Sequence, residues 1–506
     1  GKPTGTNHGG SVYMTGFWNS TKSTGHEPLF QNVIFDSNHI NYSSNTNYLN
    51  GGAVYSSRSL PYFRDVTFKY NSANHSGGAV YFDSPDTNKT ITFERTYFVG
   101  NHTSATSDGM DTYGGAVYLN DVGKTVFQDA TFDSNYVAMN GSCCTNRGGA
   151  IYVQSFYDSL IVRDSKFRAN KVYKPSGNDG GNAQGGAIYV SSGYGNVVVT
   201  NSLFDSNIAE AAVYSYSSGS SDREADGGAI RIDLQRFSNN NSYTFPYETI
   251  LINNTFVNNK ALGSGSNNYG RGGSIRLEWA QKATLFNNVF WDNRGNNFGS
   301  DSARHEIYGY DDGNSQIYLG NNNWQHAKTN ANSYGSNNID REPQFYGGSG
   351  DKYKLSDGSF LIGAGVKTFE GKTAPTKDIL GNTRPSGSST DNPDIGAYEN
   401  SLAKTTYPDK VAGLTATASN KSAILSWTAN SESNISKYAV YKSTTTGFTP
   451  ARSDSVGEST STSFTVTGLT NGTVYFIKVK AIIASPPTGS SIRLHTTGTL
   501  YSAPAG

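Results

Sequence analysis

The stretch GGAVYLNDVGKTVFQDATFDSN, from Gly114 to Asn135, contains the pattern on which the fold of this chain depends. It opens with a glycine pair, continues with alternating apolar and polar residues, and closes on Phe-x-x-Asn. Alternation with a period of two indicates β-strands rather than a helix. One structural unit therefore consists of two short strands between a glycine turn and an asparagine corner.

This unit recurs eight times along the chain. Glycine pairs begin at Gly9, Gly51, Gly77, Gly114, Gly148, Gly185, Gly227 and Gly272. The alternating Phe-x-x-Asn elements end at Asn38, Asn71, Asn101, Asn135, Asn170, Asn207, Asn259 and Asn293. Repeats of roughly 20 to 50 residues are typical of solenoids, propellers and arrays. Because a propeller blade needs four strands, a stack of coils with two or three strands each fits better.

Composition supports an ordered but weakly charged molecule. The 506 residues include 57 Gly, 33 Tyr and 25 Phe, and the 40 Lys+Arg balance the 40 Asp+Glu. A zero net charge argues against nucleic-acid binding and against a polybasic membrane partner. No apolar run is long enough to span a bilayer, so we expect no membrane insertion. The first ten residues do not resemble a signal peptide, so we expect a start after processing or at an engineered boundary.

The recurrent glycines and asparagines have physical roles in such a stack. Gly or Asn at the corners is expected to accept left-handed backbone angles. The asparagines of the Phe-x-x-Asn elements are expected to form a ladder whose amides bond to neighbouring coils. Cys143 and Cys144 are adjacent and have no zinc-type spacing, which leaves free thiols and a vicinal disulfide both open.

The repeats over about residues 9–295 resemble right-handed parallel β-helix proteins of the pectate-lyase-like superfamily. More narrowly, they are similar to the repeat of chlamydial polymorphic outer-membrane proteins and related bacterial surface proteins. The resemblance implies the fold. It implies no single activity, because this scaffold carries lyases, hydrolases, adhesins and inert stalks.

Two further resemblances follow the repeats. PDIGAYE, at Pro393–Glu399, resembles the closing module of secreted bacterial β-helix proteins of the choice-of-anchor type, which implies an extracellular or cell-surface location. We expect this module to cap the open end of the solenoid. From Pro408 onward the chain resembles a fibronectin type III domain, with Trp427 in the core and Tyr475 in the tyrosine corner.

The sequence thus predicts an all-β protein, a right-handed parallel β-helix followed by a fibronectin type III β-sandwich. The β-helix is expected over residues 1–400, with the repeats at about 9–295 and the closing module at about 296–400. A linker at 401–407, the sandwich at 408–500 and a tail at 501–506 leading to a missing segment complete the chain.

The residue after the inward Val or Ile of each first strand is expected to point outward. It is Tyr13, Tyr55, Tyr81, Tyr118, Tyr152 and Tyr189, and then Arg231 and Arg276. Parallel strands lie roughly 4.8 Å apart, so these rings stack. An exposed ladder suits the apolar faces of sugar rings; the alternative is that corner loops fold over the ladder and bury it.

Five stacked corner loops form a second candidate surface, with surface decoration as the alternative. They are residues 102–113, 136–147, 171–184, 208–226 and 260–271.

Charged residues gather where the tyrosines end. Arg231, Asp233, Arg276 and Glu278 are expected on one outer face, with Arg223, Glu224, Asp226 and Arg271 contributed by the loops. In an open groove these groups fit a polysaccharide lyase or a glycoside hydrolase. The alternative is a salt-bridge lattice between coils.

Carboxylate and amide oxygens suggest one candidate ion. Asp311, Asp312 and Asn314, together with Asp391 and Asp394, are candidate Ca²⁺ ligands, although Asp-Gly turns commonly bind no metal. We expect no required cofactor.

The sequence favours a carbohydrate-binding or adhesive protein of the bacterial surface, whose partner is a polysaccharide or cell-surface glycan. Binding is predicted to involve the corner loops and five tyrosines of the ladder, Tyr55, Tyr81, Tyr118, Tyr152 and Tyr189. A lyase or hydrolase acting on an acidic polysaccharide and a structural stalk are the alternatives. Further domains in the same polypeptide are expected as well.

Overall fold

The computed structural model describes residues 9–502 apart from internal gaps. The gaps are 20–21, 25–26, 41–48, 84–86, 106–110, 140–144, 174–180, 212–223, 236, 240–241, 264–269, 279–281, 297–305, 310–314, 325–326, 330–331, 349, 404–407, 409–410, 432–434, 449, 451 and 484–496. The chain divides into two compact units. One is Gly1–Pro343, Gly347–Lys354 and Leu361–Ala403, and the other is Gln344–Tyr346, Leu355–Phe360 and Lys404–Gly506.

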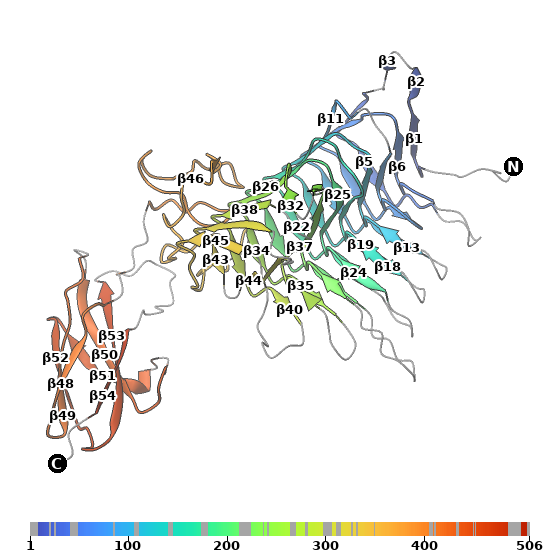
Figure 1. Cartoon of the computed structure of the whole chain (residues 1–506). Helices are drawn as coiled ribbons and strands as arrows, with labels where there is room; N and C mark the ends of the chain where they lie inside the picture. Colours follow the sequence, from blue (N-terminus) through green and yellow to red (C-terminus); the bar gives the residue numbers. More distant parts are fainter. Residues whose placement is uncertain are drawn as a thin grey trace, which may run out of the picture. The chain divides into compact units, whose positions relative to one another are not determined.

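The first unit is a stack of coils, in which each coil contributes one strand to each of several long parallel sheets (Figure 1). Sheet 1 consists of β1 (Val12–Thr15), β6 (Val54–Ser57), β10 (Val80–Asp83), β15 (Val117–Asn120), β20 (Ile151–Val153), β25 (Ile188–Gly193), β30 (Ile230–Leu234), β37 (Ile275–Glu278), β41 (Ile307–Gly309) and β44 (Ala327–Thr329). Sheet 2 consists of β4 (Leu29–Gln31), β7 (Tyr62–Arg64), β11 (Thr90–Glu94), β16 (Lys124–Gln128), β21 (Ser159–Arg163), β26 (Asn196–Thr200), β33 (Glu248–Ile252), β38 (Lys282–Phe286), β42 (Gln316–Gly320) and β45 (Asn332–Ser336).

Three shorter parallel sheets complete the coils. Sheet 3 consists of β5 (Ile34–Asp36), β8 (Thr67–Lys69), β12 (Tyr97–Val99), β17 (Thr131–Asp133), β22 (Lys166–Arg168), β27 (Leu203–Asp205), β34 (Thr255–Val257), β39 (Val289–Trp291) and β43 (Asn323–Trp324). Sheet 4 consists of β9 (Ser72–Ala73), β13 (His102–Ala105), β18 (Tyr136–Met139), β23 (Lys171–Tyr173), β28 (Ile208–Glu210), β35 (Lys260–Leu262) and β40 (Arg294–Gly295). Sheet 5 consists of β14 (Thr112–Tyr113), β19 (Thr145–Arg147), β24 (Asn182–Gln184), β29 (Ala225–Asp226) and β36 (Gly270–Arg271).

Like residues lie above like residues, because neighbouring coils pair in register. Val80 pairs with Val117, and Tyr81 with Tyr118. Inward side chains from sheets 1, 2 and 3 form one continuous core. Within it the phenylalanines of the Phe-x-x-Asn elements stack along the axis, with ring centroids 4.6 Å apart for Phe98 and Phe132. The period-two reading of the repeat is therefore confirmed.

The glycine pair is required by backbone geometry. Its first residue has a left-handed φ in all eight coils, from +59° at Gly114 to +76° at Gly9. A Cβ atom on the second residue would lie 2.2 Å from the next coil's carbonyl oxygen in the case of Gly115. The first position therefore favours glycine because of its backbone angle. The second requires glycine because a Cβ atom would clash with the neighbouring coil.

The expected asparagine ladder is present. The side-chain oxygen of Asn135 accepts hydrogen bonds from the backbone and the side-chain nitrogen of Asn101, both at 3.0 Å. Its amide donates to the carbonyl of Phe98 at 2.9 Å and to Asn170 at 3.0 Å. Every rung thus satisfies buried polar groups of its neighbours.

The expectation of left-handed angles needs one correction. In the Phe-x-x-Asn elements the residue before the ladder asparagine is left-handed, as at Ser134 (φ 56°), and the asparagine itself is not. Left-handed asparagines occur at Asn258, before the ladder residue of its coil, and between sheets 2 and 3, for example at Asn201, Asn253, Asn287 and Asn321. At that second corner the prediction is confirmed.

The stack continues past residue 295, because β41, β42 and β43 form another coil and β44 and β45 extend sheets 1 and 2. The PDIGAYE segment does not lie across the end as expected. It lies along a flank, where Asn253 donates to the carbonyl of Asp394 at 2.9 Å and Gly396 donates to that of Asn287 at 2.8 Å. The corner asparagines supply these partners, and the flank of several coils is covered.

Three two-stranded antiparallel pairs decorate the first unit. They are β2 (Phe17–Asn19) with β3 (Lys22–Thr24), β31 (Phe237–Asn239) with β32 (Ser242–Thr244), and β46 (Thr368–Phe369) with β47 (Lys372–Thr373).

The second unit contains a seven-stranded sandwich. Its sheets are β48 (Thr415–Ser419), β49 (Ser422–Ser426) and β52 (Ser463–Thr467), and β51 (Ser455–Ser459), β50 (Ile435–Ser443), β53 (Val474–Ile483) and β54 (Thr497–Ser502). A short 3₁₀-helix spans Arg452–Asp454. Trp427 lies in the core, and the backbone N–H of Thr470 donates to the Tyr475 hydroxyl at 3.2 Å, as a tyrosine corner requires.

The fold-class prediction is confirmed, since the described chain is all-β apart from that one turn of helix. Within the described residues, no helix has the length and apolarity needed to cross a membrane.

Candidate functional site

The tyrosine ladder forms as the register predicts. Successive rings stack face to face, with centroids 5.1 Å apart for Tyr13 and Tyr55 and 4.7 Å apart for Tyr81 and Tyr118. The guanidinium of Arg231 continues the stack 5.4 Å above the Tyr189 ring. In the next two coils, Arg276 lies 4.3 Å over the ring of Tyr308. Tyr308 was not expected in this series.

Of the two alternatives for the ladder, exposed or buried, burial holds for most of its members. Tyr13 is 57% exposed, but Tyr55, Tyr118, Tyr152 and Tyr189 are buried and Tyr81 is partly buried. Sheet 5 supplies part of the cover, since the Tyr113 ring lies 4.8 Å from that of Tyr152 and Arg147 lies 5.6 Å over that of Tyr189. The ladder is therefore an outer core, and its buried rings offer no face to a ligand. The role of the five predicted binding tyrosines in glycan recognition stays a prediction.

The four predicted catalytic residues do come together. Arg231 contacts Glu278 at 3.1 Å and Asp233 at 3.8 Å, and Arg276 donates to Glu278 at 3.0 Å. Arg276 has no exposed surface, and Arg231 and Glu278 are also buried. These groups form ion pairs with one another, as the alternative of a salt-bridge lattice predicted. Their catalytic role stays untested.

Loop residues extend this lattice. The carboxylate of Asp226 accepts from Arg271 at 2.8 Å and pairs with Arg231, and Arg271 also contacts Glu224 at 2.5 Å. Arg223 lies outside the described residues. Within the described lattice, three arginines face four carboxylates. Burial, with the nearby Glu278 charge adding to it, raises the pKa of Asp233 to about 6 despite the opposing effect of Arg231.

The predicted calcium ligands form no site in the described chain. Asp311, Asp312 and Asn314 lie outside it. Asp394 accepts backbone hydrogen bonds from Gly363 at 2.7 Å and Asn400 at 2.6 Å, and Asp391 accepts one from Ser388. No group of three or more His, Cys, Asp or Glu residues able to hold a metal occurs among the described residues.

The ends of the corner loops are ordered as strands. They form strands of sheets 4 and 5, and side chains of sheet 5 pack against the ladder. The central parts of the loops, with Cys143 and Cys144, lie outside the described residues.

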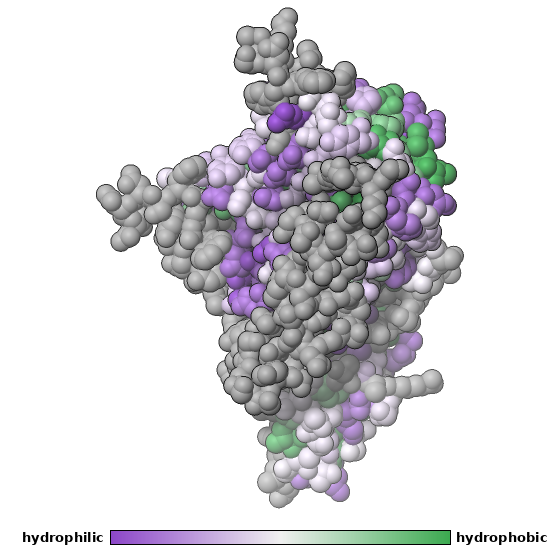
Figure 2. All heavy atoms as spheres, turned by 90° about the vertical axis from the view of Figure 1, so that its right-hand side faces the viewer, coloured by the Kyte–Doolittle hydropathy of each residue, from purple (hydrophilic) through white to green (hydrophobic). Residues whose placement is uncertain are grey.

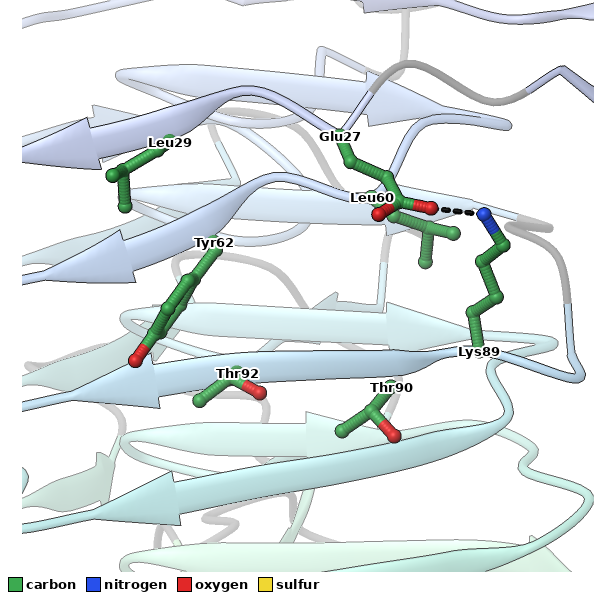
Figure 3. Close-up of a pocket in the computed structure, with 7 residues that line it drawn as sticks. All are labelled: Glu27, Leu29, Leu60, Tyr62, Lys89, Thr90 and Thr92. Atoms are coloured by element: carbon green, nitrogen blue, oxygen red, sulfur yellow. Dashed lines mark hydrogen bonds and ion pairs between the residues drawn. The ribbon is translucent and has the colours of Figure 1, made fainter.

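A cleft of about 460 Å³ opens on the outer face of sheet 2 near the N-terminal end (Figure 3). Its residues come from three successive coils and are Glu27, Leu29, Leu60, Tyr62, Lys89, Thr90 and Thr92. Leu29, Tyr62 and Thr92 occupy one register column, because β4 pairs with β7 and β7 with β11. Lys89 and Glu27 form an ion pair that passes over Leu60 (Figure 3).

Tyr62 is held in a fixed orientation in this cleft. Its hydroxyl donates to Glu94 and accepts from Arg64 Nη2 at 2.8 Å. The Arg64 guanidinium lies 4.8 Å from the ring centroid and also bonds Glu94 at 3.0 Å. The Tyr62 and Arg64 hydrogen bonds hold the pKa of Glu94 below its ordinary value. A ring fixed in this way presents a pre-organised apolar surface.

Apolar surface also gathers near this cleft. Figure 2 looks onto the end of the molecule that carries the N-terminal strands, and it shows a green patch there. Leu29, which lines the cleft, is 52% exposed. Exposed apolar surface beside a cleft is a common property of interaction sites.

Comparison with known proteins supports both parts of the architecture. Residues 409–492 match the fibronectin type III domain, and residues 65–83 match the Chlamydia polymorphic membrane protein repeat. The second match covers one Phe-x-x-Asn element and the glycine pair that follows it. The pectate-lyase part of the expected resemblance stays a prediction.

One curated relative is the probable autotransporter YfaL of Escherichia coli strain K12, which is 30% identical over 140 residues. That match covers 26% of this chain and 10% of the relative, so the chain spans about a tenth of the relative's length.

Two solved structures share limited similarity with the chain. An Fn3-like protein from Clostridium thermocellum is 25% identical over 20% of this chain and 96% of its own, with a TM-score of 0.16. The spore cortex lytic enzyme SleM of Clostridium perfringens is 14% identical over 47% of this chain and 69% of its own, with a TM-score of 0.17. Neither likeness bears on the fold of the whole chain.

Sequence reasoning missed the cleft because its column carries no repeated residue type. Leu29, Tyr62 and Thr92 share a position but no chemistry. The available signal was their common offset before the Phe-x-x-Asn element, with six residues from Leu29 to Phe35 and six from Tyr62 to Phe68.

Proposed function

We propose that this protein is exported to the bacterial surface and binds glycans through the cleft at β4, β7 and β11. The observation that carries the proposal is the fixed Tyr62 ring beside Leu29, bordered by threonine hydroxyls and by the Glu27–Lys89 pair. A sugar ring offers an apolar C–H face to an aromatic ring and hydroxyls to polar side chains. This proposal moves binding away from the buried tyrosine ladder.

The surface location is supported by two similarities. The match to a Chlamydia polymorphic membrane protein repeat and the 140-residue similarity to a probable autotransporter both concern proteins named for membranes or export. Digestion of intact cells with an external protease is expected to degrade the protein. Full protection of the chain until the cells are lysed would contradict export.

Binding through the cleft is tested with a glycan array probed by the full chain. The variant Tyr62→Ala removes the platform and is expected to weaken the strongest signals at least about tenfold. Tyr97→Ala is the matched control, because Tyr97 is an exposed tyrosine of sheet 3, 49% accessible. Unchanged binding by Tyr62→Ala, or an array without signals, would contradict the proposal.

A structural stalk is the second candidate, and the burial of the ladder favours it. Continuous ring stacks and amide ladders make a rod that needs no ligand. A rod of this kind presents its surface without binding glycans. The stalk alternative predicts that the protein is displayed on cells and gives no signal on the glycan array.

A further inference from the structure

The cleft is one end of a longer row of outward side chains on sheet 2. In-register pairing places Tyr62, Thr92, Val126, Ile161 and Val198 in a single column across five coils. Tyr62, Thr92, Ile161 and Val198 are partly exposed. Coils are spaced by roughly 4.8 Å, a distance comparable with the length of one sugar ring.

The far end of this row is already used as an apolar interface. Ile250, the next member of the column, packs near Val366, Phe369 and Ala374 of the segment that carries β46 and β47. The same column therefore binds a covering segment at Ile250 and opens into the cleft at Tyr62. Between the two ends, Ile161 and Val198 are partly exposed, whereas Val126 is buried, with 8% of its surface accessible.

The charged side chains along the row have polar partners within the protein. Arg64 bonds Glu94, Arg95 contacts Asp65, and Lys89 pairs with Glu27. Arg163, beside Ile161, donates to the side-chain oxygen of Gln128. Each of these charges has a polar partner on the protein, so an uncharged ligand leaves the pairs intact, whereas a polyanion would compete with the carboxylates.

The backbone of sheet 2 also distinguishes between ligand classes. Strands β7, β11, β16, β21 and β26 are each paired on both sides, so their edges are closed. A peptide that binds by adding a strand needs an open edge. The column from Tyr62 to Val198 offers side chains only: aliphatic groups, one fixed aromatic ring and hydroxyls.

From these observations, and resting on the proposed function, we propose that the ligand is a long, linear, uncharged polysaccharide. One end of the glycan chain lies in the cleft against Tyr62, and the rest runs along the solenoid axis past the buried Val126 to Ile161 and Val198. The row then acts as a series of subsites, so affinity depends on chain length.

The test measures binding of the full chain to cellobiose and cellohexaose by calorimetry. Cellohexaose is expected to bind at least about tenfold more tightly than cellobiose, because only the longer chain reaches Ile161. Ile161→Asp is expected to lower the affinity for cellohexaose about tenfold and to leave cellobiose binding unchanged. Val198→Thr, which nearly preserves side-chain shape, is expected to give a smaller loss in the same direction.

Ile34→Asp is the matched control, since it introduces the same charge on the exposed face of sheet 3. Melting curves of all variants identify any loss of folding, and Val198→Thr still reports on the row if Ile161→Asp unfolds. Equal affinity for the two lengths, or equal effects of Ile161→Asp and Ile34→Asp, would overturn the inference.

The remaining outcomes separate this inference from the proposed function. Tighter binding of hexagalacturonate than of cellohexaose, with loss in Tyr62→Ala, overturns the uncharged ligand and leaves glycan binding intact. Binding of an extended apolar peptide that depends on Ile161, without oligosaccharide binding, overturns the ligand class. If no glycan of any class binds the wild-type chain, both proposals fail.

Discussion

At the scale of single residues, the solenoid depends on side chains whose partners belong to other coils. Asn135 has hydrogen-bonding partners in the coil before it and the coil after it. No local sequence context supplies those partners. The cost of losing such a residue is therefore set by the groups it leaves unpaired in neighbouring coils.

Asn135→Ala is expected to destabilise the solenoid by about 3–5 kcal/mol, because several buried donors and acceptors lose their partners. The urea midpoint measured by circular dichroism checks this. Asn392→Ala, at an exposed position, is the control and is expected to change the midpoint little. A loss no larger than that of the control would show that the ladder is not a source of stability.

Tyr152→Ala is expected to lower stability by about 3–5 kcal/mol, since Tyr152 is only 4% exposed. Tyr13→Ala, at the exposed start of the ladder, is expected to cost much less. Thermal melting compares the two. Similar melting temperatures would contradict the assignment of the ladder as an outer core.

The ladder also shows how far sequence reasoning extends at this scale. The period of two and the common offset after each glycine pair were enough to predict which tyrosines stack. The sequence left exposure and burial by the corner loops both open, because the choice depends on contacts such as those of Tyr113 and Arg147 with the ladder. Those loops vary in length and composition and carry no periodic signal.

At the scale of elements, the paired strands β30 and β37 concentrate buried charge. Arg231 and Asp233 lie directly beside Arg276 and Glu278 in the register. Sequence spacing predicted this juxtaposition correctly. It did not distinguish an open groove from a closed lattice, because that depends on how Asp226 and Arg271 of sheet 5 fold over the strands.

Asp233 makes the stability of these strands dependent on pH. Its folded pKa of about 6 lies above the ordinary aspartate value, so the folded state holds the proton more tightly than the unfolded state. This contribution to stability is fully present below about pH 4 and is lost as the pH rises to about 6. Asp233→Asn removes the penalty of the ionised form.

We therefore expect Asp233→Asn to be about 1–3 kcal/mol more stable than the wild type at pH 8, with the difference vanishing below pH 4. Denaturant titrations across that range measure it. Asp158→Asn, at an exposed aspartate, is the control. A variant less stable than the wild type at pH 8 would contradict the raised pKa.

The cleft belongs to this scale as well, because three elements build it together. Leu29 of β4, Tyr62 of β7 and Thr92 of β11 meet only through in-register pairing. The order of the strands follows from the repeat. The shape of the cleft between their side chains cannot be predicted from the repeat, because it depends on three unrelated residue types and on the Glu27–Lys89 pair.

At the scale of the whole molecule, the chain consists of two units with separate cores. The change in the character of the chain near Pro408 predicts a boundary there, whereas the second unit also includes residues 344–346 and 355–360. The path of the PDIGAYE segment could not be predicted, because its anchors are the corner residues Asn253 and Asn287 of the coils. Such contacts between distant segments leave no local pattern.

Removal of one whole coil is expected to preserve the fold. Deleting residues 114–147 joins Tyr113 to Gly148, so the next glycine pair takes the place of the lost one. Circular dichroism is expected to show β-structure, and gel filtration is expected to show the same oligomeric state as that of the undeleted chain. Deleting only residues 114–130 breaks the register and is expected to cause aggregation; equal behaviour of the two deletions would contradict the modular stack.

The identical bonding of successive rungs in the asparagine ladder has a consequence for how such a protein changes over generations. A rung finds the same amide above and below it wherever it stands, so duplication or loss of a coil by unequal recombination creates no mismatched junction. Length can then drift in steps of one coil, roughly 4.8 Å each. The distance spanned by the rod becomes a trait on which selection can act separately from sequence.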